Sequence, residues 1–470
     1  MPKRITVIGG GPGGYAAAIA AAQSGASVTI IEQDQVGGTC LHRGCIPSKV
    51  MKRTAEVMDD LRRASEFALR LNGEYGVEMT RLMERKKQVI SHQLRGMTGR
   101  LKQEKIELLK GTGRIAAPGT AVVRDSEGTE SRVPWDRLIL APGAIPLEIP
   151  FLPFDGEAIL SSNDALSLET LPPSMVIVGG GIIGCELGGI FASFGVDVTL
   201  VEALDRLLPL PSVDEDISRV FQREMKKRKL KFLLNSRLEQ VKKAPDGCIS
   251  TVVSTHGATG SLEIETEKVL VCIGRRPHTS GLGLDRVGIE TDDTGAIPVD
   301  ERMRTAAPDV YAIGDALGTS RWMLAHAATA EGLVAGRNAA GADRTLSYHA
   351  VPGAVYTTPE VADVGLTQRE AQEKGYDIDV HSVLFRHVGK AHVIGHIGGE
   401  AKLVVNRKNG HILGVHMIGP HVTELISEWT LAMTAGVSVA QIANTLHPHP
   451  TLSEISMEIS LKAEGMGLYG

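Results

Sequence analysis

The chain has 470 residues, of which 43% are hydrophobic and 22% charged, and its formal net charge is −5. This length predicts about two to four domains, and the composition is that of an ordinary globular protein in water. Acidic and basic residues are interspersed, which argues against nucleic-acid and anionic-membrane binding. No stretch reaches the roughly 18 uninterrupted apolar residues of a membrane span.

Cysteine usage bears on the compartment. The five cysteines form an odd and scattered set, which argues against a secreted disulfide framework and for a reducing compartment. A basic and then apolar N-terminus superficially resembles a signal peptide, but glycines interrupt the apolar run and no cleavage site follows. We therefore expect a cytoplasmic protein.

A glycine-rich turn lies between a short apolar run and an Ala-rich segment near the N-terminus. We expect a strand, a helix and a second strand over Arg4–Ile8, Tyr15–Ser24 and Ala26–Ile31. Gly9, Gly11 and Gly14 fall in the turn, and Glu32 closes the second strand. In this context the pattern is a dinucleotide-binding fingerprint. The glycines let the backbone approach a pyrophosphate at the helix N-terminus, and the acid binds ribose hydroxyls.

The whole pattern recurs 170 positions later. Gly179, Gly181 and Gly184 repeat the glycines, and Glu202 repeats the acid. The expected strand, helix and strand cover Met175–Val178, Cys185–Phe194 and Asp197–Val201. Two accidental matches at equal spacing are improbable, so the sequence predicts two dinucleotide sites rather than two tight turns.

Two cysteines, Cys40 and Cys45, stand beside glycines in the segment GGTCLHRGCIPSK. In an ideal helix residues five apart have Cα atoms roughly 8.5 Å apart, whereas a disulfide needs about 4.4–6.8 Å. A bond between them would need a bend, which Gly44 tolerates, and Pro47 suits the first turn of a following helix. A thiolate at a helix N-terminus is stabilised, so the pair suits a disulfide that opens and closes. Two unpaired thiols in a packed turn are the alternative.

Further elements follow from apolar runs and turn residues. Charges at helical spacing predict a pair of long exposed helices over residues 53–103, and Pro146–Pro153 is expected to be a linker. Strands are expected over Val133–Gly143, Val269–Gly274 and Val310–Asp315, followed by a helix that begins near Met323.

The texture of the sequence changes beyond Leu346. Short alternating runs predict an antiparallel sheet, and two helices follow, so we expect a separate C-terminal domain. These elements are Ala401–Val405, Ile412–Ile418, Val422–Ala435 and Val439–Asn444. The histidines of this region match no compact ligand set, so we expect no metal site. They are His381, His387, His392, His396, His411, His416 and His421.

With these features together, the chain resembles the flavoprotein disulfide reductases over essentially its full length, and within that group most resembles the dihydrolipoamide dehydrogenases. The matching segments are GGGPGGY, GGTCLHRGCIPSK, GGGIIGCELGGIFASFG, IGRRP, VYAIGD, MLAH, YTTPEVADVG and HPHPTLSE. The resemblance implies an α/β fold with two Rossmann-like dinucleotide-binding domains, for FAD and NAD, and a C-terminal α+β dimerisation domain. The implied spans are 1–145 and 275–346 for the FAD and central domain, 146–274 for the NAD domain and 347–470 for dimerisation.

The resemblance also implies cofactor contacts. FAD would occupy the first fingerprint and the nicotinamide dinucleotide the second. Asp315 would bind the flavin ribityl chain, and Lys49, paired with Glu186, would lie near the reactive edge of the flavin. Further implied contacts are Gly38, Thr39, Gly113, Gly143, Gly274, Gly314, Met323, Leu324, Ala325 and His326. Pro142 departs from the hydroxyl residue common at its position, which leaves that one contact in doubt.

Glu202 discriminates between the two nicotinamide cofactors. A carboxylate accepts hydrogen bonds from ribose hydroxyls and repels a 2′-phosphate. Enzymes of this group that use NADPH place arginines here, whereas only Arg206 is nearby in this chain. We therefore predict NAD.

His449 and Glu454 carry the proposed base catalysis. A thiol with a pKa of about 8.5 is mostly protonated at pH 7, so releasing the attacking thiolate requires a base. The carboxylate would orient the imidazole of His449. A histidine between two prolines is often structural, and His447 is the rival base, but the resemblance favours His449.

The implied activity is oxidation of dihydrolipoamide by NAD⁺ through the Cys40–Cys45 disulfide and FAD. The resemblance implies a homodimer in which His449 and Glu454 of one subunit face the disulfide of the other, and a lipoyl-bearing protein of a 2-oxoacid dehydrogenase or glycine cleavage complex as partner. The alternatives are a glutathione-like or mercuric reductase, and a non-catalytic FAD/NAD-binding signalling protein. Cations near position 202 and a C-terminal vicinal cysteine pair would favour the rival reductases, but the last cysteine is Cys272.

Overall fold

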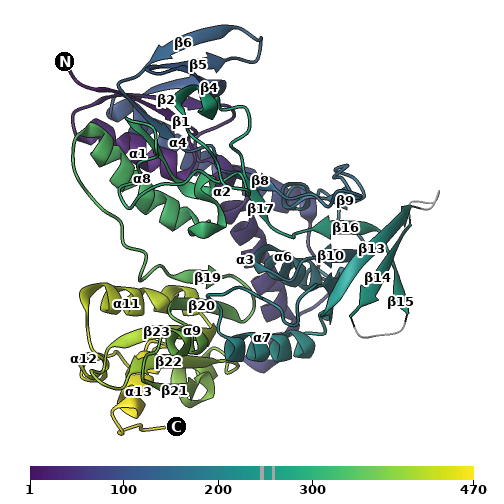
Figure 1. Cartoon of the computed structure of the whole chain (residues 1–470). Helices are drawn as coiled ribbons and strands as arrows, with labels where there is room; N and C mark the ends of the chain where they lie inside the picture. The colour runs from purple at the N-terminus through teal and green to yellow at the C-terminus, as the bar shows by residue number, and fades with distance from the viewer. Residues whose placement is uncertain (244–247, 257–259, 470) are drawn as a thin grey trace.

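The N-terminal glycine turn follows the carboxyl end of the central strand of a five-stranded parallel sheet. Its strands are β1 (Arg4–Ile8), β2 (Ser27–Glu32), β3 (Glu107–Lys110), β7 (Arg137–Leu140) and β18 (Val310–Ala312). They run in the order β18-β7-β1-β2-β3, all parallel. The computed structural model describes residues 1–243, 248–256 and 260–469, and Figure 1 shows its elements. The apolar residues Leu138–Leu140 of β7 are fully buried, as parallel strands covered on both faces require.

Helices α1 (Pro12–Gln23) and α8 (Ala325–Ala340) pack side by side against this sheet (Figure 1). Their contact depends on glycine, because a Cβ at Gly332 would lie 2.2 Å from the Gly13 carbonyl oxygen. A Cβ at Gly336 would lie equally close to the carbonyl of Ala17. This close approach brings the segment before α8 next to the first glycine turn.

A second parallel sheet repeats the arrangement. Its strands are β9 (Ile159–Leu160), β10 (Ser174–Val178), β11 (Asp197–Val201), β12 (Lys231–Leu233) and β16 (Lys268–Val271). They run in the order β12-β11-β10-β16-β9. Helix α6 (Ile182–Ser193) follows β10 as α1 follows β1, and α7 (Glu215–Lys227) follows β11. The two predicted fingerprints therefore lie in equivalent positions of two parallel sheets.

Two three-stranded antiparallel sheets and one two-stranded ribbon complete this part of the chain. The sheets are β4 (Thr112–Ala117), β5 (Thr120–Arg124) and β6 (Glu130–Pro134), and β13 (Ser236–Lys243), β14 (Ile249–Thr255) and β15 (Ser261–Thr266). The ribbon pairs β8 (Ala144–Pro146) with β17 (Arg275–Pro277). β8 follows β7 of the first sheet and β17 follows β16 of the second, so the ribbon links the two sheet domains.

The pair of helices expected over 53–103 is present as α3 (Cys45–Arg62) and α4 (Met79–Gln103). The prediction that they are simply exposed is wrong. Met51 in α3 is fully buried and shares a hydrophobic core with Phe191 of α6. Both helices are amphipathic, so the charges lie on one face while the apolar face packs on the second sheet domain.

The C-terminal region forms an antiparallel sheet covered by helices, as the sequence predicts. The strands are β19 (Gly353–Val355), β20 (Glu360–Gly365), β21 (Ile378–Leu384), β22 (Glu400–Asn406) and β23 (Ile412–Gly419), in the order β19-β20-β23-β22-β21. The helices are α9 (Gln368–Glu373), α10 (Gly389–Val393), α11 (Val422–Ala435), α12 (Val439–Ala443) and α13 (Glu454–Ala463). Figure 1 shows this region as a separate lobe below the first sheet.

Three expected strands are shorter than predicted, among them Val269–Gly274, which is observed as β16 and ends at Val271. The segment Val133–Gly143 is divided between β6 and β7, which belong to different sheets, because the chain turns at Trp135 and Asp136. The strand expected over Val310–Asp315 ends at Ala312, because the chain enters a 3₁₀ helix at Gly314, where φ is +70°. That turn places Asp315 beyond the carboxyl end of the sheet. The predicted α/β fold class is confirmed.

Candidate functional site

The first glycine turn has the geometry of a phosphate cradle. Gly9 has a φ of +103°, and a Cβ at Gly14 would lie only 1.9 Å from the Gly9 carbonyl oxygen, so both positions require glycine. Gly11 caps the N-terminus of α1, and a Cβ there would meet nothing within 4 Å. The buried carboxylate of Glu32 accepts hydrogen bonds from the Gly10 N–H at 2.6 Å and the Asp34 N–H at 2.8 Å. The open backbone at Gly11 can therefore be approached closely by a ligand.

The second turn has the same backbone conformation, close approach and carboxylate hydrogen bonds as the first. Gly179 has a φ of +108°, and a Cβ at Gly184 would lie 1.9 Å from the Gly179 carbonyl oxygen. Gly181 caps α6 and also faces open space. The buried Glu202 carboxylate accepts hydrogen bonds from the N–H groups of Gly180 at 2.6 Å and Leu204 at 2.7 Å.

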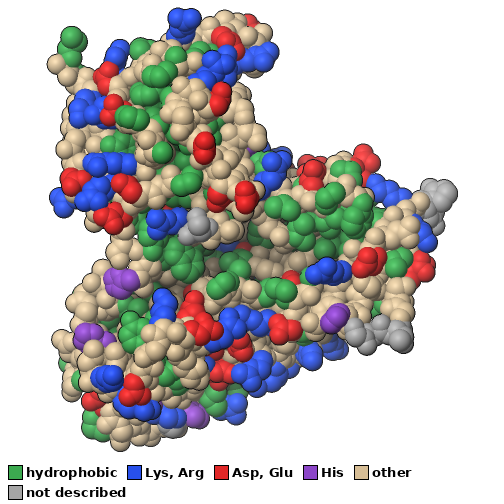
Figure 2. Space-filling view, in the orientation of Figure 1, with side chains coloured by type: hydrophobic (Ala, Val, Ile, Leu, Met, Phe, Trp, Pro, Cys, Tyr) green, Lys and Arg blue, Asp and Glu red, His purple; other side chains and the backbone are tan. Residues whose placement is uncertain are grey.

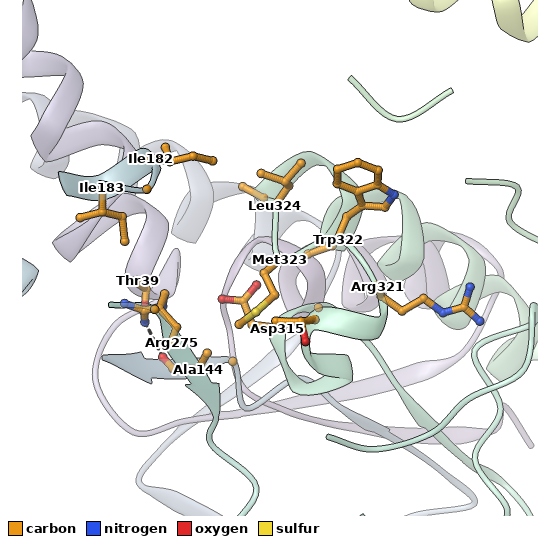
Figure 3. Close-up of a pocket in the computed structure, with 18 of the residues that line it drawn as sticks. Thr39, Ala144, Ile182, Ile183, Arg275, Asp315, Arg321, Trp322, Met323 and Leu324 are labelled. Carbon is orange, nitrogen blue, oxygen red and sulfur yellow. Dashed lines mark hydrogen bonds between the residues drawn. The ribbon is translucent and has the colours of Figure 1, made fainter. Parts of the chain in front are cut away.

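One continuous cavity of about 2390 Å³ joins the two turns. Figure 2 shows the surface hollowed between the upper and lower lobes, and Figure 3 shows part of the lining. All the predicted catalytic and cofactor-binding residues line this cavity except Gly184, His449 and Glu454. Gly184 is packed beneath Gly179. The structure thus brings the cysteine pair, both acids and the segment before α8 to one cavity.

Asp315 lies in the wall of this cavity, where burial raises its pKa and the Arg275 guanidinium opposes that rise. The preceding Gly314 N–H donates to the buried carboxylate of Glu331 at 2.6 Å, and Tyr348 Oη donates to the same carboxylate at 2.7 Å. Burial raises the pKa of Glu331 as well. Glu331 of α8 therefore fixes the loop that carries Asp315 through its hydrogen bond with Gly314.

Arg275 is a cavity residue to which sequence reasoning assigned no role. Its guanidinium donates to the Ala144 carbonyl at 2.5 Å, the dashed contact in Figure 3. Burial lowers the pKa of Arg275, and its charge faces Asp315 and Cys45. The only sequence signal was its place in the IGRRP segment after a buried strand.

The cysteine pair lies where two helices meet. Cys40 is in α2 (Gly38–Arg43), Cys45 is the first residue of α3, and Gly44 turns the chain between them. Both are free thiols, and their side chains are hydrogen-bonded to each other. Their hydrogen bond lowers the pKa of Cys45 to about 7 against the effect of burial, and the Lys49 ammonium lowers it further. The same bond and burial raise the pKa of Cys40. Cys45 is thus the thiol that ionises first.

Lys49 is held one turn further along α3. Its Nζ lies 2.8 Å from Glu186 Oε2, and Glu186 is buried in α6. The second oxygen of Glu186 accepts the Tyr356 N–H at 2.8 Å, and the Tyr356 ring centroid lies 4.2 Å from the Lys49 Nζ. Tyr356 also escaped sequence reasoning, although it begins the YTTPEVADVG segment.

His449 and Glu454 form a pair outside this cavity. His449 Nδ1 lies 2.9 Å from Glu454 Oε1, and the Thr451 N–H donates to Oε2 at 3.0 Å. Although partial burial opposes it, the His449 hydrogen bond lowers the pKa of Glu454. Since a carboxylate only accepts, Nδ1 carries the proton and Nε2 is left as the acceptor. The side chain of His449 is 75% exposed.

His447, the rival base, has both ring nitrogens engaged. Its Nδ1 lies 2.9 Å from the Thr445 carbonyl oxygen and its Nε2 lies 2.9 Å from Glu428 Oε1. His449 is therefore the freer of the two imidazoles.

Comparison with known proteins assigns the family. A family model described as pyridine nucleotide-disulphide oxidoreductase matches residues 3–332, and the dimerisation-domain model of the same family matches residues 351–459. The chain belongs to the pyridine nucleotide-disulphide oxidoreductase family. It is similar to the dihydrolipoyl dehydrogenase of Bacillus subtilis (strain 168), with 39% identity over 466 residues, 99% of each chain.

Two further relatives cover the whole chain. The dihydrolipoyl dehydrogenase of Chlamydia muridarum is 38% identical over 459 residues, 97% of this chain and 96% of the relative. The crystal structure of LpdA from Mycobacterium tuberculosis is 29% identical, with a TM-score of 0.90 over 98% of this chain and 99% of that chain. The match to the dimerisation domain supports the homodimer predicted from the resemblance.

The cofactors of this pyridine nucleotide-disulphide oxidoreductase are FAD and NAD, as the sequence predicts. The residues present fit two dinucleotides, because each of two helix N-termini offers a glycine backbone with open space beside it. A third helix, α8, begins at the cavity without a side-chain cap, which leaves its first N–H groups available to a ligand.

The predicted absence of a metal site concerns the C-terminal histidines. Across the residues that the structure describes, no group of three or more His, Cys, Asp or Glu side chains could hold a metal ion. None of the helices in the described ranges is both long and apolar enough to cross a bilayer.

Proposed function

We propose that this oxidoreductase oxidises dihydrolipoamide to lipoamide and reduces NAD⁺, as the names of its relatives suggest. The observation that carries the proposal is the Cys40–Cys45 pair, with Cys45 at a helix N-terminus and a pKa lowered to about 7. That pair lines the same cavity as both dinucleotide fingerprints.

The proposed residues for FAD surround the first turn. Gly9, Gly11, Gly14 and Glu32 hold its dinucleotide, Asp315 lies beside them, and Lys49 lies beside the cysteines. The remaining contacts are Gly38, Thr39, Gly113, Gly143, Gly314, Met323, Leu324, Ala325 and His326. When bound, FAD would supply the acceptor for the two electrons left on the cysteines and the hydride donor for NAD⁺.

The NAD residues surround the second turn. Gly179, Gly181, Gly184 and Glu202 hold the dinucleotide, with Glu186 and Gly274 nearby. Preference for NAD over NADP rests on Glu202, whose buried carboxylate would repel a 2′-phosphate. Arg206 cannot easily compensate, because its guanidinium donates to the carbonyl oxygens of Val213 and Leu210.

The thiol chemistry starts from the oxidised Cys40–Cys45 disulfide. His449 Nε2 takes a proton from one substrate thiol, and the resulting thiolate attacks Cys40 Sγ and displaces Cys45 as a thiolate. The second substrate thiol then releases its proton to solvent and attacks the substrate sulfur bound to Cys40. The cyclic substrate disulfide leaves, Cys40 is protonated by His449, and two electrons remain on the cysteine pair.

His449 acts on the cysteines of the second subunit in this proposal. The support is its position, since the His449–Glu454 pair is exposed and does not line the cavity that holds Cys40. A monomer would therefore be inactive. The partner is a lipoyl-bearing protein of a 2-oxoacid dehydrogenase or glycine cleavage complex, and the scattered cysteines support a cytoplasmic location.

The domain spans remain a proposal: 1–145 and 275–346 for FAD, 146–274 for NAD and 347–470 for dimerisation. The support for a divided FAD domain is β18, which joins the sheet of β1 although the second sheet lies between them in the chain.

Anaerobic titration of the purified holoenzyme tests the function. Dihydrolipoamide should change the flavin spectrum and produce a long-wavelength thiolate–flavin band, and NAD⁺ should reverse the change whereas NADP⁺ should not. If dihydrolipoamide leaves the flavin spectrum unchanged, the substrate proposal fails. Equal reoxidation by NADP⁺ would contradict the role of Glu202.

A further inference from the structure

Tyr356 is a residue of the C-terminal region that contacts Lys49 and Glu186, the ion pair beside the cysteines. It directly follows β19 and lines the main cavity. Its ring centroid lies 4.2 Å from Lys49 Nζ, and its backbone N–H donates to Glu186 at 2.8 Å. One residue thus contacts both members of the Lys49–Glu186 ion pair.

The Lys49 ammonium is contacted by three other residues. Its Nζ lies 2.8 Å from Glu186 Oε2 and 3.3 Å from Ser48 Oγ, while the Tyr356 ring covers another side. A lysine side chain is flexible, and its ammonium is drawn to the face of an aromatic ring. The ring therefore restricts the positions that the ammonium can take.

The position of the Lys49 ammonium matters because the charges around Cys45 affect the stability of its thiolate. The titratable or charged groups around its thiol come from five segments: Cys40 from α2, Lys49 from α3, Glu186 from α6, Arg275 from β17 and Tyr356 after β19. Lys49 and Arg275 favour the Cys45 thiolate, whereas Glu186 opposes it. A second carboxylate beside Lys49 would hold the ammonium but add to that opposition. An aromatic face holds the ammonium without adding a net charge.

We propose that Tyr356 is a positioning residue that holds the Lys49 ammonium where it stabilises the Cys45 thiolate. The inference deepens the proposed function, because it assigns a control on the thiol that reduces the cofactor. It also gives the C-terminal region a role in the chemistry of its own subunit's cysteines, besides supplying His449.

The test measures the apparent pKa of Cys45 in the holoenzyme. A Cys40→Ser background leaves Cys45 as the only thiol of the pair, and iodoacetamide modification of Cys45 is followed against pH by peptide mass spectrometry. Tyr356→Leu should raise the apparent pKa of Cys45 by roughly 0.5–1 unit, a roughly three- to tenfold loss of thiolate at lower pH. Tyr356→Phe keeps the ring and should leave the pKa within about 0.2 unit of the parent value.

A double-mutant cycle shows whether Tyr356 acts through Lys49. In a Lys49→Met background, Tyr356→Leu should cause no further rise in the apparent pKa of Cys45. Tyr75→Leu, which removes an exposed tyrosine, is the matched control and should change nothing. If Tyr356→Leu fails to retain flavin or the native circular dichroism spectrum, Tyr356→Met takes its place.

Three results would overturn the proposal: no shift in Tyr356→Leu, an equal shift in Tyr356→Phe, or a shift that persists without Lys49. The measurement uses no dithiol substrate. Failure of dihydrolipoamide as substrate would therefore leave its outcome intact, and the two proposals can fail separately.

Discussion

The Cys40–Cys45 pair and the His449–Glu454 pair lie in opposite surroundings. Cys45 lines a cavity of about 2390 Å³ and is faced by charged groups from several segments of its own chain. His449 is 75% exposed, and apart from the Glu454 carboxylate no charged group is in hydrogen-bond contact with it in the described chain.

This difference shows which part of the chemistry one chain can complete. The groups that act on the ionisation of Cys45, among them Cys40, Lys49 and Glu186, all belong to its own chain. The proposed base, His449, has the Glu454 carboxylate beside it but no thiol to act on, because the cysteine cavity does not include it. A second subunit must therefore bring base and disulfide together in our account.

The largest effect should follow from removing the thiol at the enclosed site. Cys45→Ser eliminates the sulfur that stores electrons, so turnover of dihydrolipoamide with NAD⁺ should fall by about 10⁴-fold or more. Flavin content should be unchanged. Steady-state assays and the flavin absorbance of the purified variant test both expectations, and substantial residual turnover would show that the electrons take another route.

Removing the exposed base should cost less. His449→Gln should lower kcat by about 10²- to 10⁴-fold, because the substrate thiol loses its proton acceptor. His447→Gln is the control and should lower kcat by less than about tenfold, since both nitrogens of His447 are already hydrogen-bonded. The reverse order of effects would identify His447 as the base.

The contrast between the cysteine pair and the His449–Glu454 pair also depends on how firmly the C-terminal region packs against the second sheet domain. Lys402 in β22 is 3% exposed, and its Nζ lies 2.8 Å from Asp214 Oδ1 and 2.5 Å from Asp216 Oδ2 at the start of α7. Lys402→Met leaves Asp214 buried without its cation, so the free energy of unfolding should fall by about 3–5 kcal/mol. Urea denaturation measures this loss.

An exposed ion pair provides the control for Lys402. Lys231 and Asp197 are both largely exposed, so Lys231→Met should change the free energy of unfolding by less than about 1 kcal/mol. Equal effects of the two substitutions would mean that the Lys402 contact does not fix the junction.

The smallest effect concerns a buried acid at the same junction. Burial raises the pKa of Asp363 to about 7, while a hydrogen bond from Ser212 opposes the rise. Between about pH 4 and 7 the folded chain therefore keeps a proton on Asp363 that the unfolded chain has released. As the pH rises through this range, the contribution of Asp363 to the free energy of unfolding falls, by at most about 4 kcal/mol in total. Asp363→Asn should become more stable relative to the parent between pH 5 and 8. A parallel pair of pH–stability curves would contradict the assigned burial effect.

The parts of the site that the sequence predicts are mostly local. Gly9 and Glu32 lie in one strand–turn–helix–strand unit, as do Gly179 and Glu202, so spacing alone reveals them. Cys40 and Cys45 share one short segment. His449 and Glu454 are five positions apart, and only the family resemblance distinguished them from a structural histidine and a helix-capping acid.

The remaining contacts depend on distant parts of the chain. Tyr356 and Arg275 lie within segments that carried the resemblance, but nothing in those segments indicates that the ring meets Lys49 or that the guanidinium faces Asp315. Lys402 sits in a strand where a lysine ordinarily faces water, and its partner is 188 positions away. Such contacts appear only when the sheets have packed.

Subunit complementation tests the shared site most directly. Cys45→Ser and His449→Gln homodimers should each be inactive, but a mixed dimer has one site with an intact cysteine pair and an intact histidine from the other subunit. After subunit exchange of equal amounts, half the dimers are mixed and each has one working site, so activity should recover to about a quarter of the parent value. If His449 instead acts on the cysteines of its own chain, mixing restores nothing.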